Sequence, residues 1–229
     1  MNNLQKLGGF AALYEAAAYL VGMVFFLVVV DYTNVTDPVQ KVALLADNQS
    51  IIYFLNLFIY VIFGIVLIVL ALALYDSLKK DAPAVMQVAT ALALIWAGLV
   101  IASGMIANVA TAVVVDLASS DAAQAATLWS AIEPVVDGIG GGNEMVGGLW
   151  TLLVSWVALR TGAFNKALNI LGLAAGAAGV ISAVPALAEI GGMIFGLGQL
   201  VWFAWLGIAM LRGSADVEAA IEEALVPQQ

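Results

Sequence analysis

Residues 137–160 read DGIGGGNEMVGGLWTLLVSWVALR, a segment of membrane-spanning length whose first part is rich in glycine. This part holds an adjacent amide and carboxylate, Asn143 and Glu144. An ionised carboxylate at the centre of a bilayer costs about 2.5–3.5 kcal/mol on insertion scales, so such a group is normally turned inward and partnered. The six glycines around the pair leave room for a second helix or a ligand to come close. This segment is therefore the first candidate for a functional site.

The composition places the whole chain in the membrane class. Of its 229 residues, 64% are hydrophobic and only 10% are charged, whereas soluble domains average about 25% charged residues. The chain has no cysteine and no histidine, which removes the usual ligands of zinc, iron–sulfur clusters and haem. We therefore expect no metal site and no cofactor. The net charge of −9, without a basic run, argues against a nucleic-acid partner.

Long hydrophobic segments predict an all-α fold, a polytopic membrane protein in which six helices form one transmembrane bundle. The expected spans are residues 8–30, 51–75, 85–115, 139–159, 167–187 and 191–211. Residues 1–212 would form this domain, and residues 213–229 would form an acidic cytoplasmic tail. The third span would be about 46 Å long. That length exceeds a hydrocarbon core of about 30 Å, so we expect this helix to tilt or to project beyond the membrane.

The basic residues predict the orientation. With six spans, six of the seven Lys and Arg residues fall on one side, and only Lys41 falls on the other. The six are Lys6, Lys79, Lys80, Arg160, Lys166 and Arg212. Because Lys and Arg are enriched in cytoplasmic loops, both termini should be cytoplasmic.

The sequence also predicts a helix outside the spans and a position for the tryptophans. Residues 116–138 contain an amphipathic helix that we expect to end at Pro134. The six tryptophans lie mainly near expected span ends or polar turns. This distribution is typical of an aromatic belt at the membrane interface and unlike a cofactor cage.

Two carboxylates lie inside the expected spans. Glu144 precedes Arg160 by 16 residues, which places it about 24 Å from the inner boundary. Glu15 follows Lys6 by nine residues, which places it about 13–14 Å from the same boundary. The depths differ by roughly 10 Å along the membrane normal, too much for a directly shared proton but within reach of a water link.

Asn108, eight residues before Asp116, is expected at an intermediate depth. One interpretation joins Glu144, Asn108 and Glu15 into a polar track for protons or cations. The other interpretation is that each group makes one hydrogen bond between helices and sets their register. For Asn108 we favour the structural interpretation, for Glu144 the functional one, and for Glu15 both stay open. The outer position of Glu144 also allows it simply to reach the interface.

Glycines mark one face of the fifth span. Gly172, Gly176 and Gly179 recur at helical spacing, and Ala183 continues the series. Small residues in such a series allow two helix backbones to approach closely, which a bilayer favours because it gives helices no hydrophobic push toward each other. We interpret these glycines as a helix-packing surface.

The sequence also resembles a known group of proteins. The segment GLWTLLVSWVALRTGAFNKALNILGLAAGAAGVISAVP, the closing FGLGQLVWFAWLGIAMLR and the early GGFAALYEAAAYLVG are similar to bacterial six-helix membrane proteins of the "domain of unknown function 4386" type. Members typically have a proline in the basic turn, where this chain has Asn165 and Lys166. The resemblance implies a fold and a membrane location, and it carries no catalytic residues.

Two functions from different classes fit these observations. The first is a non-enzymatic packing, accessory or scaffold protein whose partners are membrane lipid and either further copies of itself or a larger membrane complex. The alternative is a small transporter or channel-like protein that moves protons, cations or a small solute along Glu15, Asn108 and Glu144. Transport is the weaker hypothesis, because the chain has no clear inverted repeat and few charges at mid-membrane depth. An enzyme is disfavoured, since no nucleophile–base pair is visible.

Overall fold

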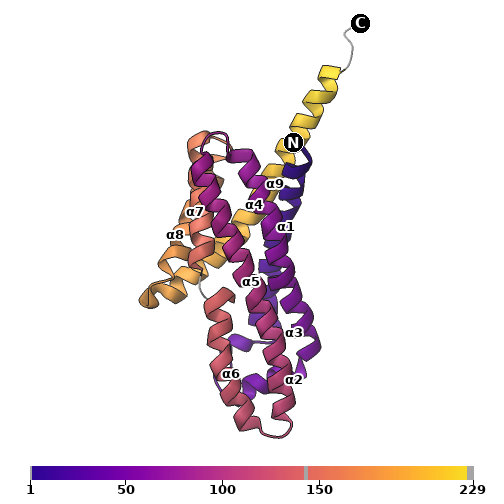
Figure 1. The fold of residues 1–229 in the computed structure, drawn as a ribbon, viewed down its shortest axis with the longest axis vertical. Helices are drawn as coiled ribbons and strands as arrows, with labels where there is room; N and C mark the ends of the chain where they lie inside the picture. Colours follow the sequence, from indigo (N-terminus) through magenta and orange to yellow (C-terminus); the bar gives the residue numbers. More distant parts are fainter. Residues whose placement is uncertain (1, 142–143, 226–229) are drawn as a thin grey trace.

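The computed structural model describes residues 2–141 and 144–225, which fold into helices without any β-strand (Figure 1). The all-α class predicted from the sequence is therefore confirmed. In chain order the elements are α1 (Asn2–Val24), η1 (Phe25–Val29), η2 (Tyr32–Asn34), α2 (Pro38–Asp47), α3 (Gln49–Asn56), η3 (Leu57–Ile62), α4 (Phe63–Leu78), α5 (Pro83–Ala118), α6 (Ala122–Val136), η4 (Asp137–Gly141), α7 (Met145–Thr161), α8 (Lys166–Ile181), η5 (Pro185–Leu187) and α9 (Ala188–Leu225).

Six of these helices form a closed ring. Going round the ring, α1 packs against α4, α4 against α5, and α5 against α7. The circle continues with α7 against α8, α8 against α9, and α9 back against α1. The first and last long helices of the chain are thus neighbours, as Figure 1 shows. The interior of this ring holds the main core of the protein.

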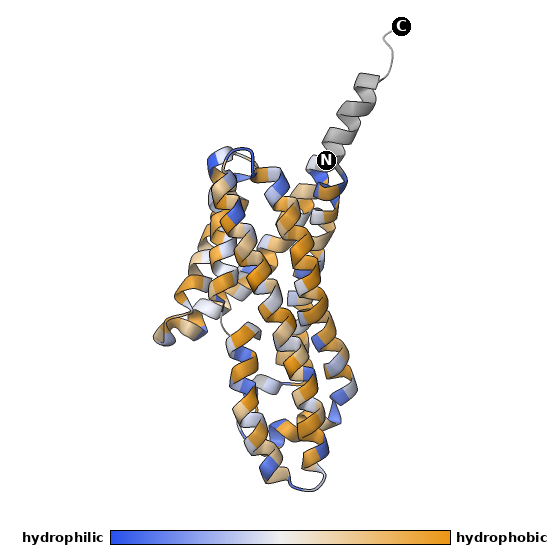
Figure 2. Ribbon diagram, viewed as in Figure 1, coloured by the Kyte–Doolittle hydropathy of each residue, from blue (hydrophilic) through white to orange (hydrophobic). Residues whose placement is uncertain are grey.

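Four helical stretches are long and apolar enough to cross a membrane, and we therefore describe the chain as a membrane protein. They are Asn3–Val29, Gln49–Leu78, Pro83–Ala118 and Pro185–Gly213. The remaining ring helices are shorter, with 17 residues in α7 and 16 in α8. Hydrophobic residues cover the outer sides of the ring (Figure 2). Exposed side chains such as Val28, Phe54 and Val109 would be unfavourable in water and suit a lipid surface.

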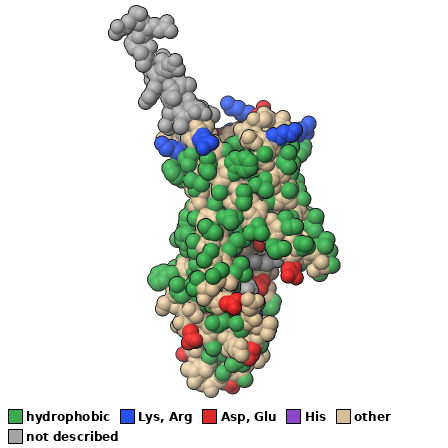
Figure 3. Space-filling view, turned by 180° about the vertical axis from the view of Figure 1, so that it is seen from behind, with side chains coloured by type: hydrophobic (Ala, Val, Ile, Leu, Met, Phe, Trp, Pro, Cys, Tyr) green, Lys and Arg blue, Asp and Glu red, His purple; other side chains and the backbone are tan. Residues whose placement is uncertain are grey.

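The two ends of the molecule differ in charge and in build. Lys and Arg side chains gather at one end, where Asp76 pairs with Lys79, whereas most of the visible Asp and Glu side chains lie on the opposite half (Figure 3). The 36 residues of α5 give a helix of about 54 Å, roughly twice the length of α7. The part of α5 that extends beyond α7 is covered by α2 and α6. We call this acidic end, made of η2, α2, α6 and the adjoining ends of α3 and α5, the cap.

The cap has a core and a polar cluster of its own. Val42, Ile52 and Val114 are buried there with Trp129. The Lys41 Nζ lies 2.6 Å from Glu133 Oε1, and the Tyr32 hydroxyl donates a 2.8 Å hydrogen bond to the same oxygen. Trp129 Nε1 in turn donates to the Tyr32 hydroxyl at 2.7 Å. These contacts join α2, η2 and α6, so the cap is a folded unit and more than a pair of surface loops.

The centre of the ring is filled by aromatic rings. Ring centroids lie 5.7 Å apart for Phe63 and Trp96, 5.8 Å for Trp96 and Trp150, and 5.7 Å for Trp150 and Trp202. Such spacing is favourable for aromatic pairs. The aromatic-belt prediction was wrong for these three tryptophans, which are at most 4% exposed. Gly147 makes the arrangement possible, because a Cβ there would lie 2.8 Å from the Trp96 ring.

Several predicted boundaries differ from the structure. The segment 137–160 is divided between η4 and α7, so it is not one continuous helix. Pro134 lies inside α6, which continues to Val136 before the chain changes to the wider winding of η4. Proline removes one backbone hydrogen bond and favours a kink, and here the change in winding comes three residues later. The fifth expected span corresponds to α8, which ends at Ile181 and not at residue 187. The sixth expected span corresponds to α9, which continues past Arg212 without a break.

Candidate functional site

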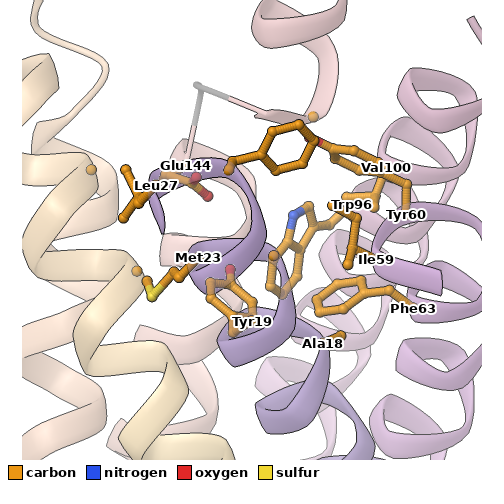
Figure 4. Close-up of a pocket in the computed structure, with 15 residues that line it drawn as sticks. Ala18, Tyr19, Met23, Leu27, Ile59, Tyr60, Phe63, Trp96, Val100 and Glu144 are labelled. Atoms are coloured by element: carbon orange, nitrogen blue, oxygen red, sulfur yellow. The ribbon is translucent and has the colours of Figure 1, made fainter. Parts of the chain in front are cut away.

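Glu144 lines a cavity inside the acidic half of the ring (Figure 4). The cavity has a volume of about 320 Å³ and is lined by residues of α1, η1, η3, α4, α5, η4 and α9 and by Glu144. We call it the ring cavity. Glu144 is the residue before the first turn of α7, and its carboxylate makes no capping hydrogen bond to that helix. Its backbone oxygen accepts the regular helical bond from Gly148 N at 2.8 Å, which holds the residue in place.

Aromatic side chains form most of the wall. Tyr19 comes from α1, Phe63 from α4 and Trp96 from α5, and their rings are in mutual contact through Phe63. Phe26 and Tyr60 complete the aromatic lining. In Figure 4, Tyr19, Phe63 and Trp96 lie together on one side of the cavity, with Glu144 across from them. The ring cavity is therefore an aromatic chamber with one carboxylate.

Three π-helical turns meet at this cavity. Phe26 and Leu27 belong to η1, Ile59 and Tyr60 to η3, and Gly140 to η4. A π turn holds one extra residue and is wider than an α turn, and such turns are frequent at functional sites. In each case α-helical winding changes to π winding at residues that line the cavity. This coincidence marks the ring cavity as the candidate site.

Local contacts explain how η4 and η3 reach the cavity. A Cβ at Gly140 would lie 2.9 Å from Ser103 Cβ and 3.1 Å from Val100 Cα, so only glycine lets η4 lie directly on α5. The Ser103 hydroxyl donates to the Val136 carbonyl oxygen at 2.9 Å, which fastens the end of α6 to the same helix. Gly104 has the same role for η3, since a Cβ there would meet Tyr60 Cβ at 2.5 Å.

A second, smaller cavity lies next to the first on the cap side. It has a volume of about 90 Å³ and includes Tyr32, Trp129 and Glu133 in its lining. We call it the cap cavity. Phe26 and Tyr60 line both cavities and so form the wall between them.

Glu15 lies in the ring core and outside the cavity lining. Its side chain is fully buried, and neither carboxylate oxygen has a hydrogen-bond partner among the described residues. Tyr19, one helical turn further along α1, lines the ring cavity. Glu15 is therefore one turn of α1 away from a residue of the cavity wall.

Asn108 does not belong to this site. It lies 25 residues into α5, about 37 Å from the basic end, whereas α7 is only about 25 Å long from its end to Glu144. Along the helices Asn108 is thus farther from the basic end than Glu144, whereas the sequence analysis expected it at a depth between Glu144 and Glu15. Asn108 Oδ1 accepts a 2.9 Å hydrogen bond from Asn56 Nδ2, and Asn108 Nδ2 donates to the Tyr53 backbone oxygen at 3.3 Å.

The remaining predicted residues lie elsewhere. Asn143 falls outside the described residues. A Cβ at Gly176 would lie 2.7 Å from both Gly148 O and Leu152 N of α7. Gly179 is similarly close to Phe195, and Gly172 is packed against α7 and α9. These glycines are therefore occupied by contacts within the chain.

Three polar residues of the ring were not predicted from the sequence as site residues: Gln199, Tyr19 and Tyr60. Gln199 is fully buried in α9, and its Nε2 donates to Thr151 Oγ1 at 2.9 Å. Tyr19 and Tyr60 carry the hydroxyl groups of the ring cavity. The spacing of Tyr19 four residues after Glu15 is the one sequence signal that could have linked it to a polar site. Within residues 2–141 and 144–225, no group of three or more metal-ligating acidic, His or Cys side chains is found.

Comparison with known proteins gives a family and no activity. No curated protein and no solved structure matches the chain. Residues 9–209 match the sequence model of the family described as "Domain of unknown function (DUF4386)". The match covers the cap and all of the ring except the first turns of α1 and the end of α9, and it confirms the resemblance seen in the sequence. This chain of apolar helices is therefore a member of the DUF4386 family.

Proposed function

We propose that this protein is a non-enzymatic membrane protein that binds a small, mainly apolar molecule in the ring cavity. The observation that carries this proposal is the cavity of about 320 Å³, lined by five aromatic side chains and one carboxylate. Small-molecule sites are typically concave, mainly apolar, and about 300–1,000 Å³ in volume, with a few polar groups that orient the ligand. The three π turns at the same place add to this support.

The absence of catalytic groups in the described lining favours binding over catalysis. Glu144 is the one carboxylate of that lining, and no serine, threonine or lysine lies in it. A covalent mechanism needs a nucleophile within hydrogen-bond reach of a base. A water-activating metal would need further ligands beside Glu144.

We further propose that all six ring helices cross a bacterial inner membrane with both termini in the cytoplasm. At 17 and 16 residues, α7 and α8 are about 24–26 Å long. Local thinning of the bilayer or their position in the ring can accommodate that length. The gathering of Lys and Arg at one end supports the orientation through the positive-inside rule (Figure 3). The cap would then lie on the outer side.

A scaffold role built on glycine faces has less support than the sequence led us to expect. Gly172, Gly176 and Gly179 all contact other helices of the same chain. None of these three glycines is free to contact a partner, so binding to a larger complex or to a second copy stays a prediction.

Transport is the second candidate function, and Glu15 is the observation that favours it. A fully buried carboxyl group without a hydrogen-bond partner is costly in a structural role and is typical of proton relays in membrane proteins. In this version Tyr19 would take the place that the sequence analysis gave to Asn108, because Tyr19 lines the ring cavity and follows Glu15 by one turn of α1.

The binding proposal can be tested with a neutral heavy-atom quencher. We would titrate the protein in lipid nanodiscs with 4-bromoneopentylbenzene and follow the tryptophan emission, since bromine at contact distance quenches Trp96. Gly192 lines the cavity and has free space around its Cβ position, so Gly192→Leu should fill the cavity without a backbone clash. Gly98→Leu is the matched control, because Gly98 also has free space but lies outside the lining.

We expect saturable quenching in the natural protein and in Gly98→Leu, and at least tenfold weaker quenching in Gly192→Leu. Trp96→Phe measures the contribution of the other five tryptophans. Equal quenching in all variants would overturn the proposal. A proteoliposome flux assay on Glu15→Gln separates the second candidate, which requires a pH-dependent movement of solute or protons that this variant loses.

A further inference from the structure

We propose that the molecule bound in the ring cavity is a small organic cation with an apolar body, such as a substituted ammonium ion. This inference rests on the proposed function and names the chemical class of the ligand. It combines three independent features of the cavity: the sign of its charge, its aromatic wall and the surface around it.

The described lining of the cavity holds one acidic group and no basic group. Glu144 is the one charged side chain among the described lining residues, and that lining holds no Lys or Arg. The one basic residue of the cap, Lys41, is already paired with Glu133 at 2.6 Å. The carboxylate of Glu144 makes no capping hydrogen bond to α7. A carboxylate within a membrane bundle normally has a partner, and a cationic ligand would supply one.

The wall opposite Glu144 suits a cation as well as an apolar group. Tyr19, Tyr60 and Trp96 present electron-rich rings to the cavity, and Tyr19 contacts Phe63 with ring centroids 5.8 Å apart. Cations are attracted to the faces of such rings, and sites for quaternary ammonium ions are commonly built as aromatic cages. An anionic ligand would be repelled by both Glu144 and the ring faces.

The negative charge of the surrounding surface also favours a cationic ligand. Eight acidic residues of the cap and its neighbouring turns stand against Lys41 alone. They are Asp31, Asp37, Asp47, Asp116, Asp121, Glu133, Asp137 and Glu189. Acidic side chains are visible over this half of the molecule in Figure 3. A surface of one sign raises the local concentration of ions of opposite charge and speeds their arrival.

The volume favours a free solute over a membrane lipid. A cavity of about 320 Å³ is at the lower end of the range for small-molecule sites, about 300–1,000 Å³. It has room for a compact ammonium ion with a ring or a short chain. A phospholipid could place only its head group there, and its ammonium group would compete for the same carboxylate.

The test uses two probes of the same shape and different charge. We would compare (4-bromobenzyl)trimethylammonium with neutral 4-bromoneopentylbenzene, in which carbon replaces the charged nitrogen, by quenching of Trp96 in phosphatidylglycerol nanodiscs. We expect the cation to bind at least tenfold more tightly than its neutral counterpart to the natural protein. Glu144→Gln should abolish this preference while it keeps the binding of the neutral probe. Gly98→Leu should keep the preference.

Each other outcome has a definite meaning. Equal binding of both probes to the natural protein would overturn the cation assignment and leave the proposed function intact. Quenching by neither probe would overturn both. If Glu144→Gln does not fold, as judged by its melting curve, the comparison of the two probes on the natural protein decides alone. Loss of probe binding when phosphatidylethanolamine is added would assign the site to a lipid head group and overturn the assignment to a free solute.

Discussion

The side-chain amide of Asn56 on α3 donates a 2.9 Å hydrogen bond to the side-chain oxygen Oδ1 of Asn108 on α5. Asn56 is 4% exposed, so its amide has no ready replacement in water. Asn108 also donates to the Tyr53 carbonyl oxygen at 3.3 Å. Asn108 thus holds α3 to α5 through two hydrogen bonds at the point where the ring meets the cap.

We predict that Asn108→Leu lowers the free energy of unfolding by about 0.6–1.7 kcal/mol, the range for polar contacts between membrane helices. The reason is that Asn56 Nδ2 and the Tyr53 carbonyl oxygen lose their partner. Reversible unfolding in mixed micelles would measure the effect. The double variant Asn56→Leu/Asn108→Leu should recover part of the loss, because both polar groups are then removed. A single variant as stable as the natural protein would show that this pair does not hold the helices together.

Alanine substitution should change the stability in opposite directions at Gly176 on α8, which packs closely against α7, and at Gly98 on α5, which has free space. Gly176→Ala should destabilise the protein by about 1–3 kcal/mol, because the new Cβ meets backbone atoms of α7 and the helices must move apart. Gly98→Ala should instead stabilise it by about 0.5–1 kcal/mol, since Gly98 has free space and alanine favours a helix. Melting curves of the two variants compare them directly. Equal effects at both positions would contradict the packing role of Gly176.

Replacement of Glu15 should raise the stability of the protein, in contrast to replacement of Asn108 or Gly176. Burying a polar group without a hydrogen bond costs about 1–3 kcal/mol in proteins, and both oxygens of Glu15 lack a partner among the described residues. Glu15→Met should therefore raise the free energy of unfolding by a similar amount. Glu15→Gln should give little gain, because an amide also needs partners. A loss of stability in Glu15→Met would show that the carboxyl group has a structural role after all.

The cap should lose stability at high pH through Tyr32. Burial, followed by the hydrogen bond to Glu133, raises the pKa of Tyr32 above its ordinary value, which is about 10. The folded protein therefore holds the Tyr32 proton more tightly than the unfolded chain does. This contribution to stability is fully present below pH 10 and is lost as the pH rises toward the folded pKa.

Unfolding measured between pH 8 and pH 11 tests this effect. Above pH 10 the natural protein should lose up to about 1.4 kcal/mol more per pH unit than Tyr32→Phe. At neutral pH, Tyr32→Phe should be less stable by about 1–3 kcal/mol, because it leaves Trp129 Nε1 without its acceptor. Parallel pH curves for the two proteins would argue against a raised pKa at this residue.

Cysteine labelling tests the proposed orientation, and the natural chain has no cysteine to interfere. Ser120→Cys lies at the exposed tip of the cap, and Asp81→Cys lies in the exposed turn at the basic end. We expect an impermeant maleimide added to intact cells stripped of their outer membrane to label the first and to spare the second. Labelling of Asp81→Cys alone would reverse the proposed topology.

The sequence predicted the class of the molecule better than its site. Hydrophobic length alone marked the long helices, and the great length of α5 was visible in residues 85–115 because no polar turn interrupts them. The depth of Asn108 was misjudged because hydropathy does not show where a helix leaves the bilayer. Asp116 resembles a boundary residue in sequence, whereas α5 passes the end of α7 and enters the cap.

The aromatic core and the cavity could not be read from the sequence for a similar reason. Trp96, Trp150 and Trp202 come from three different helices, and their meeting depends on ring order and rotation. Glu144 was singled out in the sequence because a carboxylate among glycines is costly and rare in a membrane segment. The structure places it in the lining of the ring cavity. Its aromatic neighbours could not be foreseen, since they come from helices that the sequence does not place beside it.

The wall between the two cavities has a consequence for movement. Its two side chains, Phe26 and Tyr60, both belong to π turns, η1 and η3. Each residue of a helix turns the chain by about 100°, so a one-residue change in winding would swing either ring away from its present place. The same change would merge the two chambers and open a passage from the aromatic interior to the acidic tip. The separation of the ring cavity from the cap cavity thus depends on the π-helical winding of η1 and η3. A molecule that binds against Phe26 or Tyr60 would favour one winding over the other.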